Sequence, residues 1–231
     1  MPETTEPLGD GPHPKDGPIA VDDARRIVER FRREVNDQTD PDVDDLRLFR
    51  GQSSEAKARL RQALATLLDQ GNEGEQQYAA WMLGYEGTAQ DMALMARLYV
   101  VRGWDTWHIA SMGLARQHHM LTAEERQGLS GVFLTDPSRH LRIVRALFLG
   151  PHDDALWQQF AAFIAGTDDA KTLGQALEAT LGTPRVADFG MLMRARPEAI
   201  VRAVVEQVGG GWDRILLPAW GFGPRNPPTR E

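Results

Sequence analysis

Apolar positions recur every three to four residues along most of the chain, a spacing that predicts amphipathic helices. The recurrence is clearest between Ser53 and Gly71, where these apolar residues keep helical spacing: Ala56, Leu60, Ala63, Leu64, Leu67 and Leu68. Alternation of β-branched residues with period two, which is typical of a half-buried strand, is missing. We therefore expect an all-α protein.

Helix start and stop signals divide this pattern into pairs of helices. Thr122 with Glu125 matches a capping box, and Asp136-Pro137 matches an N-cap followed by proline at the first helical position. Further starts are expected at Ser53, Thr88, Asp153, Asp168 or Asp169, and Pro197, and helix ends at Gly71, Gly103, Gly150, Gly166, Gly182 and Gly209. These signals predict about five antiparallel helical hairpins.

The remaining segments flank the hairpins. An extra N-terminal helix is expected because Val21, Ala24, Val28, Phe31 and Val35 form an apolar stripe. The run NDQTDPDVDD is acidic and contains Pro41, so it predicts a connector. The expected organisation is a Pro/Gly-rich disordered tail at 1–18, a single domain at 19–217 with a first helix at 19–37, a connector at 38–52 and repeats at 53–208, and a Pro-rich tail at 218–231.

A Leu-Gly pair recurs along the hairpins. It ends the helical segment EQQYAAWMLG at Gly84 and returns at Leu149-Gly150 and Leu181-Gly182, about two units and one unit apart for a period near 33 residues. The member expected between the first two is replaced by Gln117-His118, so the repeat is degenerate. Together with the short hairpins, this pattern resembles HEAT-like, or TPR-like, helical repeats over residues 53–208. The resemblance implies a right-handed α-solenoid used as a binding scaffold.

Composition narrows the class of partner. The 231 residues carry a formal net charge of -7 and contain no cysteine. An acidic chain lacks the basic character expected of a protein that binds nucleic acid, and its charge favours solubility or a basic partner. The absence of cysteine removes disulfides and thiolate nucleophiles, and no apolar run approaches the length of a membrane span. We expect a soluble, cytoplasmic protein.

Motifs for catalysis or cofactor binding are missing. His108 and His119 share a face of one expected helix but lie about 16 Å apart, too far to bind one metal ion. Nucleophile motifs and phosphate-binding glycine loops do not occur, and the paired acids mostly open helices, where the helix dipole favours them. We expect neither an enzyme nor a bound cofactor or metal.

Aromatic residues cluster in one part of the chain and form the first candidate contact surface: Tyr78, Trp81, Tyr85, Trp104 and Trp107. On a helix, the first three of these lie nearly opposite Ala79, Ala80 and Leu83. Such residues pack between helices in any α-domain, but tryptophan and tyrosine also dominate protein interfaces. Both interpretations remain open at this stage.

A second candidate is a row of arginines at Arg139, Arg142 and Arg145, which could contact phosphates, contact an acidic partner, or form a solvated face. HEAT-like alkylpurine DNA glycosylases have a similar length and number of hairpins, and they hold DNA on a basic concave face. The net charge of this chain disagrees with that use, and no catalytic motif of that family can be placed on its residues.

The leading functional hypothesis is a non-enzymatic module that binds one protein partner. Small acidic helical-repeat proteins of this kind resemble bacterial immunity proteins, which neutralise a cognate toxin, so the partner is expected to be basic. The alternatives are a glycosylase-type enzyme acting on nucleic acid and a generic assembly adaptor.

Overall fold

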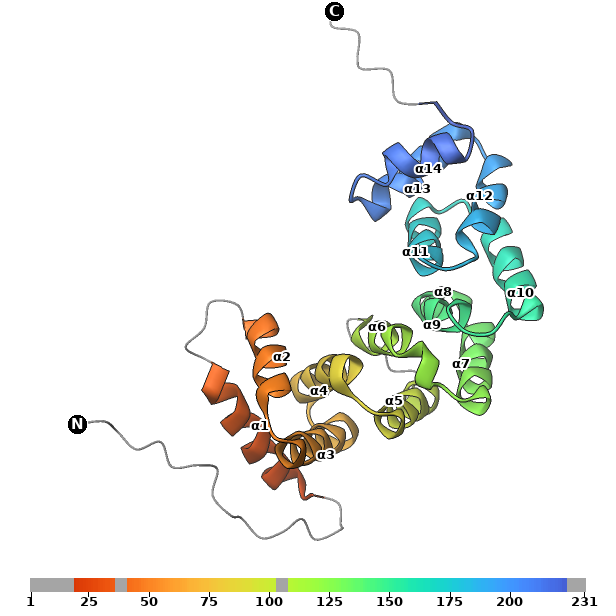
Figure 1. The fold of residues 1–231 in the computed structure, drawn as a ribbon. Helices are drawn as coiled ribbons and strands as arrows, with labels where there is room; N and C mark the ends of the chain where they lie inside the picture. Colours follow the sequence, from red (N-terminus) through yellow and green to blue (C-terminus); the bar gives the residue numbers. More distant parts are fainter. Residues whose placement is uncertain (1–18, 36–40, 103–107, 224–231) are drawn as a thin grey trace, which may run out of the picture. The chain divides into compact units, whose positions relative to one another are not determined.

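The computed structural model describes residues 19–35, 41–102 and 108–223 (Figure 1). Every regular element in these ranges is a helix and none is a strand, so the all-α prediction is confirmed. The predicted tail at 1–18 lies outside the described residues. Contacts group the chain into two compact units, residues 1–79 and 80–231, where the sequence predicts one domain.

The first unit contains α1 (Val21–Val35), α2 (Pro41–Gly51), α3 (Ser54–Gln70) and the beginning of α4 (Glu73–Glu86). α1 packs against α2 and α3. The predicted stripe of α1 supplies Ala24, Val28 and Phe31 to the core, where they meet buried leucines of α3. The Ser53 hydroxyl accepts a hydrogen bond from the N–H of Ala56, as the predicted N-cap requires.

The helix α2 replaces most of the connector predicted at 38–52. Proline is tolerated in the first turn of a helix because the N–H it lacks has no helical partner there, and Pro41 is the first residue of α2. Phe49 is only 1% exposed, and the guanidinium of Arg61 on α3 lies 5.2 Å from the centre of its ring. Burial of this apolar side chain favours a helix over residues 41–51, so the connector prediction is wrong for those residues.

The second unit begins within α4, and its described residues continue with ten α-helices and two short 3₁₀ turns. They are α5 (Ala89–Arg102), α6 (Ile109–Arg116), η2 (His118–Met120), α7 (Ala123–Thr135), α8 (Pro137–His140), η3 (Leu141–Ile143), α9 (Val144–Phe148), α10 (Asp154–Ala165), α11 (Ala170–Thr180), α12 (Val186–Arg194), α13 (Glu198–Val208) and α14 (Asp213–Ala219). Among the described elements, α5 packs against α6 and α7, α6 against α9, and α11 against α12 and α13 (Figure 1).

Several predicted helix starts are confirmed by side-chain caps. The Thr122 hydroxyl accepts from the N–H of Glu125, whose carboxylate accepts from the N–H of Thr122 in return. The predicted N-caps whose carboxylates accept a backbone hydrogen bond are Asp136, Asp153 and Asp169. Pro197 stands one residue before its helix rather than at the first position, because α13 begins at Glu198.

The three Leu-Gly pairs do not share one structural role. Gly84 lies inside α4, so the prediction that a helix ends there is wrong. Gly150 follows α9, and a Cβ at this position would overlap the guanidinium of Arg126. Gly182 follows α11 with φ +73°, a conformation that residues with a Cβ rarely adopt. The three glycines therefore stand in different surroundings.

Phe160 joins four helices in the core of the second unit. Its fully buried ring on α10 lies between 5.2 and 6.5 Å from the rings of these aromatic residues: Phe133 on α7, Phe148 on α9, Trp157 on α10 and Phe189 on α12. Rings at these separations attract one another beyond the burial of their area.

The C-terminal helix α14 was not expected, and the tail predicted at 218–231 begins later than residue 218. Trp220 is 5% exposed, and its ring lies 6.0 Å from the ring of Phe189. Gly190 makes room for the indole, since a Cβ there would overlap Trp220 Nε1. Residues 224–231 lie outside the described residues.

Candidate functional site

Tyr78 is the first aromatic residue of α4 and belongs to the first unit. Its hydroxyl donates a hydrogen bond of 2.6 Å to the carboxylate of Asp45 on α2, and the guanidinium of Arg32 on α1 lies 4.7 Å from its ring centre. Nearby, Arg25 Nε donates to Glu75 Oε1 over 2.6 Å, and this hydrogen bond is the main cause that lowers the pKa of Glu75. The hydroxyl and one ring face of Tyr78 are thus in contact with other residues of the first unit.

Trp81 and Tyr85 lie in the second unit, one turn apart on α4. Their ring centres are 5.5 Å apart in an edge-to-face arrangement, and both side chains are half-buried. The guanidinium carbon of Arg116 on α6 lies 3.5 Å from the centre of the Tyr85 ring. This distance is short for a cation over an aromatic face, and such a contact is favourable even at an exposed site.

Two glycines allow this contact because they bring α4 and α6 together. A Cβ built on Gly84 would lie 2.7 Å from the Cα of Gly113, and one built on Gly113 would lie 3.0 Å from the Cα of Gly84. Backbone therefore meets backbone at the point where the two helices cross. Gln117 fixes the same pair of helices, since its Nε2 donates to the carbonyl oxygen of Tyr85 over 3.1 Å.

The side chains beside this crossing form one surface. Trp81 and Tyr85 are four residues apart on α4, and Met112 and Arg116 are four residues apart on α6, so each pair shares a helix face. The contact between Tyr85 and Arg116 joins the two faces. Met112 is 57% exposed, and Arg116 is exposed as well. We call these four residues the α4–α6 surface.

Two members of this surface, Trp81 and Tyr85, are candidates that the sequence also provides. Met112 and Arg116 are not among the sequence candidates, because nothing in their spacing reveals a contact with another helix. The pair of glycines, each in the middle of an apolar helical run, was the only signal that pointed to a close crossing. The predicted Trp104 and Trp107 lie outside the described residues.

The predicted arginine row runs through three short elements rather than one helix. Arg139 lies on α8, Arg142 on η3 and Arg145 on α9. Arg139 and Arg145 are exposed, and Arg142 is half-buried. Within the described residues, Arg142 Nη1 is buried without a hydrogen-bond partner. The row is therefore uneven, with its middle member turned partly into the protein.

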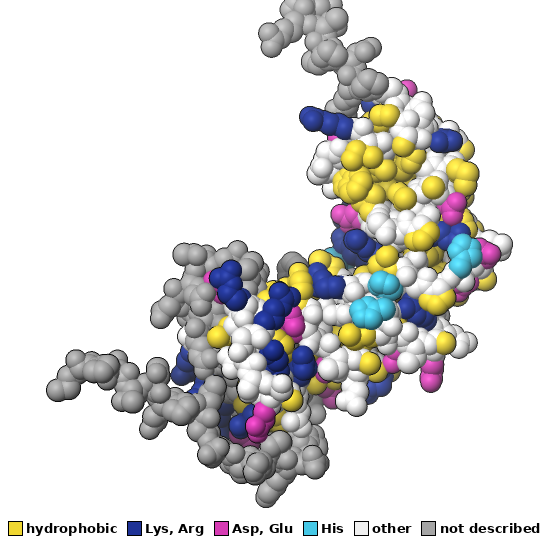
Figure 2. Space-filling model, viewed as in Figure 1, with side chains coloured by type: hydrophobic (Ala, Val, Ile, Leu, Met, Phe, Trp, Pro, Cys, Tyr) yellow, Lys and Arg dark blue, Asp and Glu magenta, His cyan; other side chains and the backbone are white. Residues whose placement is uncertain are grey.

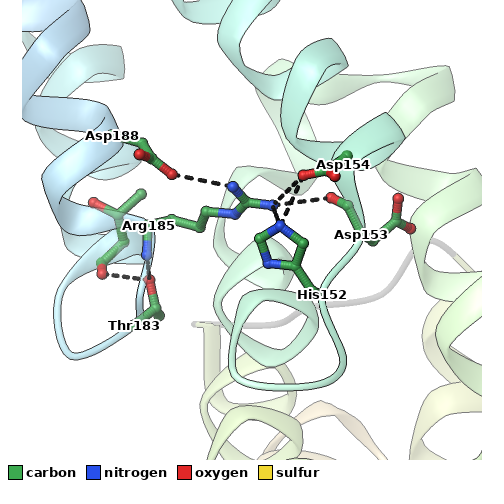
Figure 3. A network of polar contacts seen from close by, with 7 residues as sticks. His152, Asp153, Asp154, Thr183, Arg185 and Asp188 are labelled. Carbon is green, nitrogen blue, oxygen red and sulfur yellow. Dashed lines mark hydrogen bonds and ion pairs between the residues drawn. The ribbon is translucent and has the colours of Figure 1, made fainter.

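A further polar cluster surrounds Arg185, immediately before α12 (Figure 3). Its side chain is 9% exposed; Nη1 donates to Asp188 over 3.0 Å, and Nη2 donates to Asp154 over 3.2 Å and to the carbonyl oxygen of Asp153. His152 Nε2 lies 2.8 Å from Asp154, whose pKa is lowered mainly by the Arg185 hydrogen bond. The carboxylates of Asp154 on α10 and Asp188 on α12 neutralise the arginine. Their shared contact with Arg185 links α10 to α12.

This cluster borders a pocket of about 130 Å³ that is also lined by Pro151 and Pro184. A pocket of this size has room for a few water molecules.

No group of three histidine or acidic side chains in the described part of the chain is placed to hold a metal ion. None of the described helices combines the length and the apolar character that a bilayer crossing requires.

Hydrophobic side chains also gather over α13 and α14 on the face seen in Figure 2. Ile215 on α14 is 60% exposed and contributes to the exposed apolar area of these helices. Part of this apolar area lies on α14, a helix that the sequence signals do not predict.

Comparison with family models, with curated proteins and with solved structures gives no match.

Proposed function

We propose that this chain is a non-enzymatic protein-binding module and that the α4–α6 surface is part of its contact with one protein partner. The supporting observation is the composition of that surface, in which tryptophan, tyrosine, methionine and arginine lie together. These residue types are enriched in protein interfaces, and the aromatic residues and arginine carry most of the binding energy there.

The arrangement is also ordered before a partner arrives. Arg116 is stacked on Tyr85, and Tyr85 is held against Trp81. A long side chain that is already fixed loses less conformational entropy on binding, so more of its interaction energy appears as affinity.

The scaffold that we propose is a right-handed α-solenoid of about five HEAT-like hairpins. The packing of α5 on α6 and of α11 on α12 and α13 is compatible with such a stack. Scaffolds of this type mostly present surfaces for binding.

The specific role that we propose is that of a cytoplasmic bacterial immunity protein that neutralises a basic toxin. The acidic excess lies mostly in residues 1–79, which carry 17 acidic and 11 basic side chains, whereas residues 80–231 carry 16 and 15. A basic surface on the partner would therefore complement the first part of the chain. A generic assembly adaptor would use the same α4–α6 surface without this charge preference.

An enzyme of the glycosylase type is the second candidate function. Arg142 and Arg145 favour it, because neither has an ion-pair partner among the described residues. Tight binding to duplex DNA requires many clustered cations that release counterions. The nearly balanced charge of residues 80–231 argues against such binding.

Capture of the partner from a lysate of the source organism tests the proposal. Wild-type protein is expected to retain one partner, and Tyr85→Ala, Met112→Ala and Arg116→Ala are each expected to weaken retention, with about 2 kcal/mol lost for the stronger positions. Arg97→Ala removes an exposed arginine of α5 and should retain the partner fully. Thermal midpoints equal to that of the wild type establish that each variant is folded.

Equal retention by all four variants contradicts the proposed surface. Submicromolar, salt-sensitive binding of duplex DNA that is lost in Arg142→Ala and Arg145→Ala favours the glycosylase-type function instead.

A further inference from the structure

Arg116 is an exposed cation of the second unit, and no carboxylate of the described residues pairs with it. Three other arginines that reach across elements there are paired with oxygen atoms: Arg126 with carbonyl oxygens, Arg185 with two carboxylates and Arg196 with Asp168. Arg116 differs because its contact is a ring. An aromatic face attracts the positive charge and leaves the N–H donors at the edge of the guanidinium unpaired.

The orientation of this guanidinium is set by the Tyr85 ring at 3.5 Å. A planar fork of N–H donors held in place matches the two oxygens of a carboxylate, and such bidentate pairs are stronger and more directional than those of lysine. The group expected to form an ion pair with Arg116 is therefore an anion with two oxygens in one plane.

The neighbours of Arg116 distinguish a carboxylate from the phosphates of a nucleic acid. One turn earlier on α6 lies Met112, which is 57% exposed, and across the crossing lies the aromatic pair of α4. A nucleic-acid backbone offers a row of charges and needs a row of cations, whereas this surface offers one cation beside apolar groups. A polypeptide with one acidic residue next to a large apolar residue matches that arrangement.

On the premise of the proposed function, we infer that the α4–α6 surface binds an acidic segment of the partner. A carboxylate of that segment pairs with Arg116, and an adjacent apolar side chain covers Met112. The basic surface proposed for the partner would bind residues 1–79. It is a different part of the partner from the acidic segment that binds Arg116.

Selection of short random peptides displayed on phage against the full-length protein tests this inference. Peptides enriched on the wild type are expected to carry aspartate or glutamate beside a large apolar residue. The same peptides should be depleted about tenfold or more on Arg116→Ala and unchanged on Arg97→Ala. A synthetic version in which glutamine replaces the glutamate should lose binding to a similar extent.

Three results overturn the inference: enrichment of peptides without an acidic residue, equal enrichment on wild type and Arg116→Ala, or unchanged binding of the glutamine version. A single-stranded oligonucleotide that binds more tightly than these peptides, and whose binding is lost in Arg116→Ala, also overturns the inference. Arg116 would then bind a phosphate rather than a carboxylate.

Different results of the capture experiment contradict the inference and the proposed function. Loss of the cellular partner in Met112→Ala and Tyr85→Ala, with full retention in Arg116→Ala, leaves the protein-binding function in place and overturns the acidic segment. Full retention in all three variants overturns both.

Discussion

Replacing Phe160 with alanine is expected to lower the free energy of unfolding by about 3–5 kcal/mol, because it leaves a cavity where a fully buried ring stood. The loss lies at the upper end of this range, since the ring contacts four other aromatic side chains from four helices. Urea denaturation followed by circular dichroism measures the change as a lower midpoint.

The matched control is Phe163→Ala. Phe163 lies on the same helix and is only half-buried, so its removal should cost about half as much or less. Equal costs for the two substitutions would contradict the position that the structure gives to Phe160.

Replacing Gly84 with alanine is expected to cost about 1–3 kcal/mol, although alanine is the better helix former. The added methyl group would lie 2.7 Å from the backbone of Gly113, and a backbone atom cannot rotate away as the end of a side chain can. The two helices must therefore move apart. Since the crossing holds Arg116 over Tyr85, the same variant should also retain less partner.

Gly131→Ala is the control for this substitution. Gly131 lies inside α7 with no atom within 4 Å of an added Cβ, so the change should stabilise the protein by up to about 1 kcal/mol. Thermal melting of both variants is the measurement. A Gly84 variant that is stabilised like the Gly131 variant would show that α4 and α6 are not in contact.

Local signals predicted much of the fold. A cap such as Thr122 with Glu125, or Asp153 before α10, acts within one helical turn, so four neighbouring residues determine it. The apolar stripe of α1 is local in the same sense. These features were predicted from the sequence because the interacting groups are close along the chain.

Features that depend on distant residues were not predicted. Asn36 to Asp45 reads as a polar connector, yet Phe49 is buried against Arg61 of α3, and this burial favours a helix from Pro41 to Gly51. Gly84 reads as a helix end, but it lies inside α4 and meets the backbone of Gly113 on α6. In both cases the deciding partner lies on another helix.

The candidate surface shows the same division. The aromatic residues of α4 could be selected by composition, but their separation into two environments could not: Tyr78 is occupied by Asp45 and Arg32, and Tyr85 by Arg116. Sequence spacing gives the face of a helix on which a side chain lies. It does not identify the group that meets it.

Photo-cross-linking from position 112 tests the central claim most directly. A benzophenone amino acid placed there in the full-length chain should cross-link, in lysate, to the partner that the wild type captures, because Met112 is an exposed member of the α4–α6 surface. The same probe at Ala162, which is exposed on α10, should give no such product. Cross-linking of that partner from position 162 and not from position 112 would contradict the assignment of the α4–α6 surface as the contact face.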